Sequence, residues 1–232
     1  MQILALDTST EVCAVALGDG VTWHEKSEVA GQRHSELLLP MIRAILAECS
    51  VTLKQIDGIA FGAGPGSFTG LRIACGVAQG LALGAALPVV GVSTLEAMAQ
   101  TRRDLAGGER IIAALDARMR EVYVAAYERD SGRWREAIAP VVVSPALAPV
   151  PEGRGWIAAG SGFAAYPSLR ERYGEALSEC NGTIVPSASA VGKLALPLFA
   201  AGEGVPARDA APLYVRHRVA LTIAERAAGL RQ

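Results

Sequence analysis

GAGPGSFTGLRIACGVAQGLALG, the stretch from Gly62 to Gly84, decides how this chain folds. It follows the apolar residues Ile59 to Phe61 and leads from a glycine-rich loop into a helix with almost no bulky surface. Glycine permits a positive φ and a close approach of backbone, proline stiffens a turn, and Ser67 is placed to cap the helix. The stretch therefore predicts a strand, a tight connection and a helix that something else approaches closely.

The same loop has a second interpretation, a phosphate cradle. A helix N-terminus attracts anions, and a glycine-rich loop before it often holds phosphate. However, no Gly-Lys-Ser or Gly-Lys-Thr follows, so the lysine of the Walker mechanism is missing. On this stretch by itself, both the tight connection and the nucleotide-binding loop remain open.

Two helical stretches are too apolar around their circumference for one core. Glycine costs roughly 1 kcal/mol against alanine inside an exposed helix, so Gly76, Gly80 and Gly84 require a packing reason such as a closely lying helix. The earlier stretch from His34 to Cys49 carries an apolar stripe at helical spacing that is wider than one core normally needs. Both stretches predict contact with a partner helix.

Composition limits the remaining function classes. With 232 residues, 51% of them hydrophobic and 19% charged, the chain can bury a sizeable core as one domain or two small lobes. We find no uninterrupted apolar run of membrane-spanning length and no secretory signal, and we therefore expect a cytoplasmic protein without membrane contact. A net charge of −1 gives no general attraction to nucleic acid, and four cysteines without a Cys-x-x-Cys pair fit reduced core thiols.

The chain repeats itself. ILALDTSTEVCAVAL, from Ile3 to Leu17, is echoed by IAALDARMREVYVAAY, from Ile112 to Tyr127, and each copy reads as strand, turn, strand. The first copy continues with a strand over 21–29, a helix, a strand over 56–61, the glycine helix, a strand over 88–90 and a helix from Thr94. This order predicts an α/β fold of two units, residues 1–107 and 108–232, each with a mixed sheet and flanking helices.

Duplicated units of this order resemble the actin, sugar-kinase and Hsp70 architecture, in which two ribonuclease-H-like lobes face a nucleotide cleft. The motifs ILALDTST, HSELLLPMIRAIL, DGIAFGAGPGSFTGLRIACGVAQGLA, GVSTLEAMA and LDARMREVYVAAY resemble the bacterial TsaB (YeaZ) family in order and spacing. The resemblance covers most of the chain and is weakest over residues 132–206. It implies a protein needed to form threonylcarbamoyladenosine beside the anticodon of tRNAs that read codons starting with A, acting as the non-catalytic partner of the paralogue TsaD.

The sequence carries its own check on the missing catalysis. TsaD proteins hold a metal with a His-x-Glu-x-His pair, and the matching positions here are Thr94, Glu96 and Met98. A hydroxyl and a thioether cannot replace two imidazoles on one helix face. The histidines, at positions 24, 34 and 217, are far apart in sequence. We therefore expect no metal site, no resident cofactor and no enzyme activity of the isolated chain.

Two aspartates are the strongest remaining candidates for chemistry. Asp7 and Asp116 each end an apolar strand, where kinases and ATPases of this architecture orient magnesium around phosphate. Asp7, Thr8 and Ser9 keep a hint of the phosphate loop, so these three residues and Asp116 are predicted as vestigial nucleotide contacts. The alternative function is an actin-like ATPase or kinase that uses Asp7 and Asp116.

The resemblance also predicts partners. The helices over 34–49 and 67–84 are expected to pack against the equivalent pair of TsaD, or against a second copy of this chain in a two-fold homodimer. The ATPase TsaE is expected to join the assembly, tRNA is expected to bind within the complex, and an adenine nucleotide at the TsaD interface remains open. The predicted interface residues are Leu37, Leu38, Met41, Ile42, Ile45, Ile73, Ala74, Val77, Gly80 and Leu81.

Overall fold

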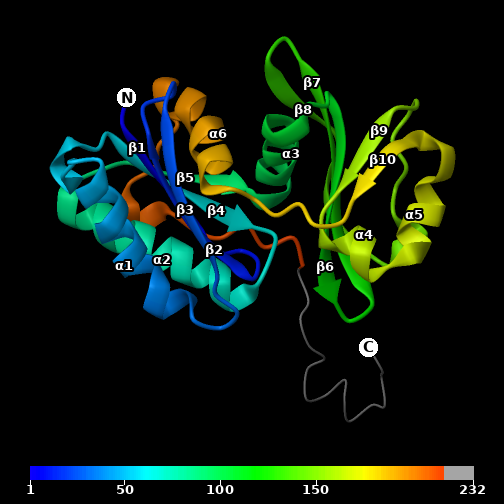
Figure 1. Ribbon diagram of the computed structural model, residues 1–232, viewed down its shortest axis with the longest axis horizontal. Coiled ribbons are helices and arrows are strands. Elements are labelled where there is room, and N and C mark those ends of the chain that lie inside the picture. Colours follow the sequence, from blue (N-terminus) through cyan, green and yellow to red (C-terminus); the bar gives the residue numbers. More distant parts are fainter. Residues whose placement is uncertain (217–232) are drawn as a thin grey trace.

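Two lobes, each built around a five-stranded mixed sheet, make up the computed structural model, which describes residues 1–216 (Figure 1). The strands of the first sheet are β1 (Ile3–Asp7), β2 (Val12–Gly18), β3 (Trp23–Val29), β4 (Gly58–Gly64) and β5 (Val89–Ser93). Those of the second are β6 (Arg110–Arg118), β7 (Glu121–Asp130), β8 (Arg133–Val143), β9 (Trp156–Ala159) and β10 (Leu177–Asn181). The helices are α1 (His34–Glu48), α2 (Phe68–Ala85), α3 (Thr94–Ala106), α4 (Ser161–Ala165), α5 (Pro167–Tyr173) and α6 (Ala188–Ala200).

The two sheets have the same topology. The first has the order β3-β2-β1-β4-β5, and the second has β8-β7-β6-β9-β10 when read in the same direction. In both, the opening three strands are antiparallel neighbours, and the last two add parallel strands beyond the first one. The internal repeat seen in the sequence therefore corresponds to a repeated unit of structure, and the α/β prediction of two such lobes is confirmed.

Helices cover the sheets in layers. Helices α1 and α2 lie side by side on one face of the first sheet, and α6 covers the other face (Figure 1). Helix α3 lies between the lobes and contacts both α6 and the second sheet, while α4 and α5 lie on the far side of that sheet. The first sheet consequently has two apolar cores, one under α1 and α2 and one under α6.

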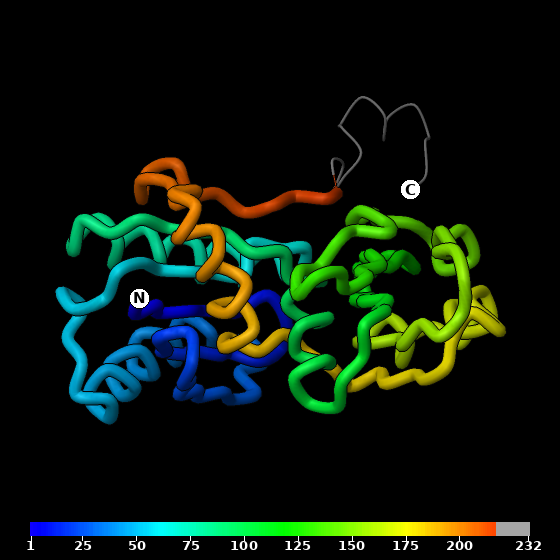
Figure 2. The backbone as a smooth tube through the Cα atoms, turned by 90° about the horizontal axis from the view of Figure 1, so that it is seen from above, coloured from blue at the N-terminus to red at the C-terminus, as the bar shows by residue number. Residues whose placement is uncertain are grey.

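The boundary expected between residues 107 and 108 separates the two sheets. Part of the chain after this boundary nevertheless belongs to the first lobe. Helix α6 and the segment after it belong to the later part of the chain, yet both pack on the first lobe. Residues 205–216, named here the C-terminal strap, pass over α2 and run toward the second lobe (Figure 2). The apolar inward face of α6 completes the core of the first sheet, which explains why the chain returns there.

The boundaries of three strands differ from those expected. The strand predicted from residue 21 begins at Trp23, because the Asp19 carboxylate accepts hydrogen bonds from the amides of Val21 and Thr22 and folds them into a turn. Strands β4 and β5 both extend further toward their carboxyl ends than predicted. Gly62 and Gly64 belong to β4 and Gly91 to β5, although the predicted strands ended before them.

Helix α2 bears on the expectation that the chain has no membrane contact. Helix α2 has 18 residues with a mean hydropathy of 1.2, which makes it long and apolar enough to cross a membrane by these criteria. This is weak evidence, because a core helix of a globular domain passes the same test. Six of its residues are buried, and they pack on the first sheet.

Candidate functional site

The glycine-rich loop before α2 lies directly on the turn after β1. A Cβ atom added at Gly62 would lie 1.9 Å from Oδ2 of Asp7, and one added at Gly70 would lie 1.9 Å from the carbonyl oxygen of Thr8. A Cβ atom added at Gly66 would likewise lie 2.4 Å from the carbonyl oxygen of Ser9. The close approach of backbone that the glycines predicted is therefore confirmed, and the element they approach is the β1–β2 turn of the same chain.

Hydrogen bonds fix this contact. The amide of Ser67 donates to the Ser9 carbonyl at 2.8 Å, and Thr8 Oγ1 donates to the Gly70 carbonyl at 2.7 Å. The Ser67 hydroxyl in turn accepts from the amide of Gly70 at 3.3 Å, which is the predicted helix cap. The start of α2 and the turn after β1 thus form one interlocked unit.

Asp7 is buried in that unit with half of its carboxylate unsatisfied. Oδ1 accepts hydrogen bonds from the Ser9 amide at 2.9 Å and the Ser9 hydroxyl at 2.8 Å, whereas Oδ2 has no partner among the described residues. Burial raises the pKa of Asp7 to about 7, against the lowering effect of the Ser9 hydrogen bonds. The side chain is therefore held at the boundary between its charged and neutral forms near neutral pH.

The three predicted nucleotide contacts in this turn have little exposed surface. Asp7, Thr8 and Ser9 are 1%, 0% and 2% exposed, because the glycine-rich loop covers them. In this conformation a phosphate group has no access to the three side chains. The structure gives them a packing role, and their contact with a nucleotide stays a prediction.

Asp116, the fourth predicted contact, lies in the other sheet and is partly exposed. Its Oδ1 accepts hydrogen bonds from the Tyr166 hydroxyl and the Arg118 amide, both at 2.9 Å, and its Oδ2 lies 3.1 Å from the Arg118 guanidinium. The β6–β7 turn beside it has positive φ values at Arg118, Met119 and Arg120. Thus Asp7, Thr8 and Ser9 lie together, while Asp116 has its own set of local partners.

Thr94 and Met98, which the resemblance matches to the metal-binding histidines of TsaD, are buried in the chain's own core. Thr94 and Met98 are fully buried, and Met98 packs in the cluster between α3 and the second sheet. Burial, together with the smaller effect of the neighbouring Glu136 charge, raises the pKa of Glu96 to about 7. Within residues 1–216, no cluster of three or more His, Cys, Asp or Glu side chains could hold a metal ion.

The predicted helix interface divides into two sets. Four of its residues pack in the chain's own core and are buried, namely Leu38, Ile42, Ile45 and Ala74. This corrects the prediction for those four, because the apolar stripe that carries them faces the first sheet. Six others remain at the surface or half-buried beside it, namely Leu37, Met41, Ile73, Val77, Gly80 and Leu81. We call these six the α1–α2 face.

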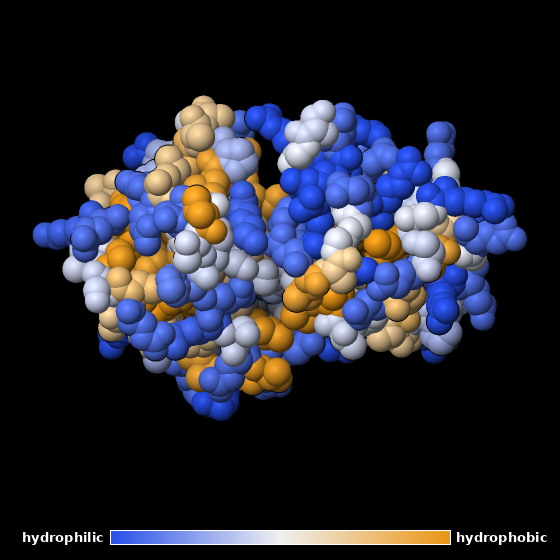
Figure 3. Space-filling view, turned by 45° about the horizontal axis from the view of Figure 1, so that its top comes forward, coloured by the Kyte–Doolittle hydropathy of each residue, from blue (hydrophilic) through white to orange (hydrophobic). Residues whose placement is uncertain are grey.

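The glycines of α2 explain how this face can be approached. A Cβ atom added at Gly76, Gly80 or Gly84 would meet nothing within 4 Å. These glycines are therefore not required by any described neighbour, in contrast to the glycines of the loop. In the space-filling view, hydrophobic residues also reach the surface of the first lobe and the region where the lobes meet (Figure 3).

An aromatic cluster at the start of α2 was not predicted from the sequence. Phe68 and Tyr214 are 51% and 45% exposed, and their ring centroids are 6.0 Å apart. The Arg72 guanidinium lies 3.8 Å from the Phe68 ring centroid, and its Nε donates to the Tyr214 hydroxyl at 3.3 Å. The four-residue spacing of Phe68 and Arg72 could have indicated the first contact, but Tyr214 comes from the strap, far away in sequence.

Comparisons with known proteins agree with this structure. The family TsaD, described as tRNA N6-adenosine threonylcarbamoyltransferase, matches residues 23–187. The tRNA threonylcarbamoyladenosine biosynthesis protein TsaB of Escherichia coli K12 is 42% identical over 95% of this chain and 96% of its own. The protein of the same name from Haemophilus influenzae Rd is 39% identical over 94% of this chain and 95% of its own.

Solved structures lead to the same group. The structure described as YeaZ from Pseudomonas aeruginosa has a TM-score of 0.86 and 42% identity, covering 92% of this chain and 99% of its own. A second structure from that organism, described as an uncharacterized protein with similarity to peptidase YEAZ, has a TM-score of 0.87 at the same identity, covering 93% and 99%. On fold, sequence identity and coverage together, this chain belongs to the TsaB (YeaZ) family.

Proposed function

We propose that this chain takes part in forming threonylcarbamoyladenosine in tRNA, as a non-catalytic subunit that binds TsaD. The observation that carries the proposal is the relation to the TsaB protein of Escherichia coli, which extends over nearly the whole of both chains. A relation of this extent includes both lobes, the glycine-rich loop and the helices of the α1–α2 face. The role in tRNA modification that the relative's name states is accordingly proposed for this chain.

The α1–α2 face supports binding as the mode of action. Glycines that meet no described neighbour cost helix stability in the isolated chain, so a benefit must arise elsewhere. Small residues allow two helix backbones to approach closely, and the half-buried side chains of Leu37, Met41 and Ile73 have apolar surface left to bury. A pair of helices from a related fold would fit this surface.

The burial of the turn after β1 and of Thr94 and Met98 supports a role without catalysis. Thr94 and Met98, the positions that the resemblance matches to the metal ligands of TsaD, are buried, and Asp7 is covered by the glycine-rich loop. Catalysis through a bound metal ion or through the Asp7 carboxylate needs side chains that can reach a substrate. We therefore place the chemistry on TsaD and assign this chain a conformational role.

The remaining parts of the proposal concern the assembly. A second copy of this chain competes with TsaD for the same face, and TsaE joins the complex of the two proteins. The tRNA binds within that complex, an adenine nucleotide lies at the TsaD interface, and the assembly works in the cytoplasm. The near-neutral charge of the chain agrees with tRNA binding that depends on its partners.

Mixing the purified protein with TsaD from the same genome tests the proposal. Ile73→Asp and Gly80→Trp should each weaken complex formation by roughly a hundredfold, because they add charge or bulk to the face. Tritium-labelled or mass-resolved threonylcarbamoyladenosine in tRNA should fall in parallel. Leu147→Asp, which changes a residue that is 74% exposed elsewhere, is the matched control. Normal complex formation by both face variants, with unchanged melting temperatures, would contradict the proposed interface.

An actin-like ATPase is the competing function. It predicts ATP turnover by the isolated chain that Asp7→Asn abolishes. The burial of Asp7 under the loop argues against it, because a nucleotide-bound magnesium ion would need access to that carboxylate. Turnover that resists Asp7→Asn would indicate a contaminating ATPase.

A further inference from the structure

Strand β5 forms one edge of the first sheet, and part of that edge has no backbone partner among the described residues. Val89 exchanges two hydrogen bonds with Val205 of the C-terminal strap, each 2.9 Å long, in an antiparallel bridge. The pairing does not reach Gly91, because the antiparallel register would pair Gly91 with Glu203, whose amide donates to the Leu198 carbonyl of α6 at 2.9 Å. After Val205 the strap turns into the short helix η4 (Ala207–Asp209). The edge thus accepts an antiparallel backbone, but the strap pairs with one residue of it.

The next outward-facing residue of β5 is Gly91. Successive residues of a strand direct their backbone groups to alternate sides, and Val89 directs both of its groups away from β4. The amide and carbonyl of Gly91 therefore also point away from β4, and no hydrogen bond between described residues uses them. Gly91 is exposed, so these groups are open to a partner. An unpaired edge of this kind is a template for an additional strand.

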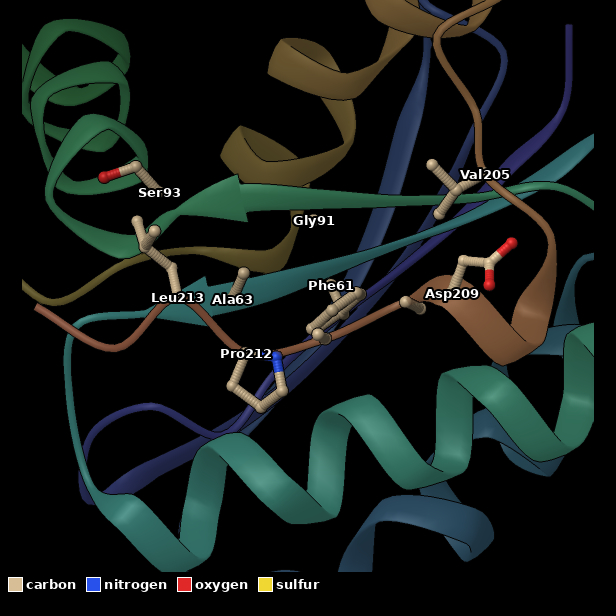
Figure 4. Close-up of a pocket in the computed structure, with 10 residues that line it drawn as sticks. Phe61, Ala63, Gly91, Ser93, Val205, Asp209, Pro212 and Leu213 are labelled. Atoms are coloured by element: carbon tan, nitrogen blue, oxygen red, sulfur yellow. The ribbon is translucent and has the colours of Figure 1, made fainter.

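A pocket of about 320 Å³ lies beside this edge (Figure 4). Phe61, Ala63 and Gly91 contribute from the sheet, and the strap encloses the opposite side with Asp209 and Leu213. The Leu213 amide donates to the Ala63 carbonyl at 2.7 Å, which holds the strap in place. Asp209 is the charged residue among those that line the pocket, and its described ion pair, with Arg208 at 3.7 Å, is long and exposed.

We propose that the β5 edge at Gly91 binds a short extended segment of a partner polypeptide by antiparallel strand addition. Backbone hydrogen bonds to Gly91 would continue the pairing that Val205 begins. One apolar side chain of the segment lies in the pocket against Val205 and Leu213, which are 37% and 45% exposed, and a lysine or arginine two residues along, on the same face of the segment, reaches the Asp209 carboxylate. This site goes beyond the proposed function, because it lies on the edge of the sheet and not on the α1–α2 face.

The pattern of backbone groups favours a peptide over a small molecule. The amide and carbonyl of Gly91 point in the same direction. They can therefore exchange two hydrogen bonds with one residue of an antiparallel strand, as Val89 does with Val205. At about 3.4 Å per residue, a segment of two or three residues extends over the unpaired part of the edge.

Peptide titration of the isotope-labelled full-length protein, followed by amide NMR, tests this site. The probe is acetyl-Thr-Val-Thr-Lys-Thr-amide, in which Val and Lys lie on the same face. We expect saturable shifts at Gly91, Val92 and Asp209 with a Kd on the order of 1 mM. Gly91→Pro should weaken binding by roughly tenfold, since it removes an amide hydrogen that no described hydrogen bond uses. Asp209→Lys should have a similar effect, and Asp130→Lys, on the exposed β7–β8 turn, is its matched control.

Three results would overturn the proposal. They are the absence of saturable shifts at several millimolar probe, equal binding by a probe with Glu in place of Lys, and unchanged binding by a folded Gly91→Pro variant. A fourth result would show that the β5 edge has a different occupant. If hydrogen exchange shows the Gly91 amide already protected in the full chain, and exposed once residues 217–232 are deleted, the edge binds the chain's own terminal segment. Loss of TsaD binding is not among these outcomes, so the two proposals fail separately.

Discussion

The turn after β1 and the turn after β6 occupy the same position in the two copies of the repeat, yet their surroundings are opposite. Asp7 lies 1% exposed beneath the glycine-rich loop, with one carboxylate oxygen unsatisfied among the described residues. Asp116 is partly exposed and has both carboxylate oxygens occupied, by Tyr166 and Arg118. Equivalent topology has therefore produced a packed junction in one lobe and an open turn in the other.

The difference originates in the residues directly after the fourth strand of each sheet. At the end of β4 and the start of α2 the chain supplies Gly62, Gly66 and Gly70, which lie against the first turn. After β9 it supplies Gly160 and Gly162, whose added Cβ atoms would meet Ala114 on β6. The second lobe thus packs its glycines on the strand and leaves its turn free. A shared fold does not preserve a shared site, because a few residues next to the strand decide which groups the turn contacts.

The largest effect should come from breaking the packed junction. Gly70→Ala places a Cβ atom 1.9 Å from the Thr8 carbonyl oxygen, so backbone must move, and we expect a loss of roughly 3 kcal/mol or more in unfolding free energy. Gly76→Ala, in the same helix, meets nothing within 4 Å and should raise stability by about 1 kcal/mol. Urea denaturation of the two variants checks this pair. Equal stability would show that the loop does not hold the turn.

The next effect concerns the charge of Asp7. Its folded-state pKa of about 7 lies above the ordinary value of 3.8, so the protonated form stabilises the fold. This contribution is complete below pH 3.8 and is lost as the pH rises through 7, by up to about 4 kcal/mol. Asp7→Asn should remove that dependence. Its buried amide has a cost of its own, so we expect a net gain of about 1 to 2 kcal/mol at pH 8.

Melting temperatures of the wild type and Asp7→Asn, measured from pH 4 to pH 8, test this sign. At acid pH the wild type should be the more stable of the two, because the amide cost of the variant remains; the two curves should cross as the pH rises, and the variant should be the more stable at pH 8. A variant that loses stability at pH 8 would mean that the carboxylate has a compensating partner when ionised.

The smallest effect should come from the open turn. Asp116→Asn keeps an acceptor for Tyr166 and removes the ion pair with Arg118, whose side chain is 87% exposed. Exposed ion pairs contribute little, so we expect a loss below about 1 kcal/mol in unfolding free energy. Calorimetry on this variant beside Asp7→Asn compares the two turns directly. A loss as large as that of Gly70→Ala would show that both turns serve the same packing purpose.

Much of the fold could be predicted because its signals are local or repeated. The alternating strands around Asp7 and Asp116, and the helix that begins at Ser67, depend on neighbouring residues. Strand ends were predicted less well where glycine lies inside a strand, as at Gly62 and Gly91. Glycine ends a strand or continues it according to the element beside it, and that neighbour comes from elsewhere in the chain.

The candidate site was predictable in part for the same reason. The apolar width of the two helices indicated a surface, but spacing could not distinguish Leu38, which faces the chain's own core, from Leu37 beside it. The burial of Asp7 depends on a loop more than fifty residues later in the chain, and the placement of Tyr214 depends on the course of the strap. Such long-range contacts leave no periodic trace in the sequence.

The C-terminal strap also limits how the lobes can move. Its Leu213 amide is anchored to β4 of the first lobe, and its Arg216 guanidinium donates to the Ala117 carbonyl and pairs with Glu121 in the second. An extended chain covers at most about 3.6 Å per residue, so such a short tether leaves little slack. Moving the two lobes apart beyond that reach would break one of these anchors, so the strap limits how far the lobes can open.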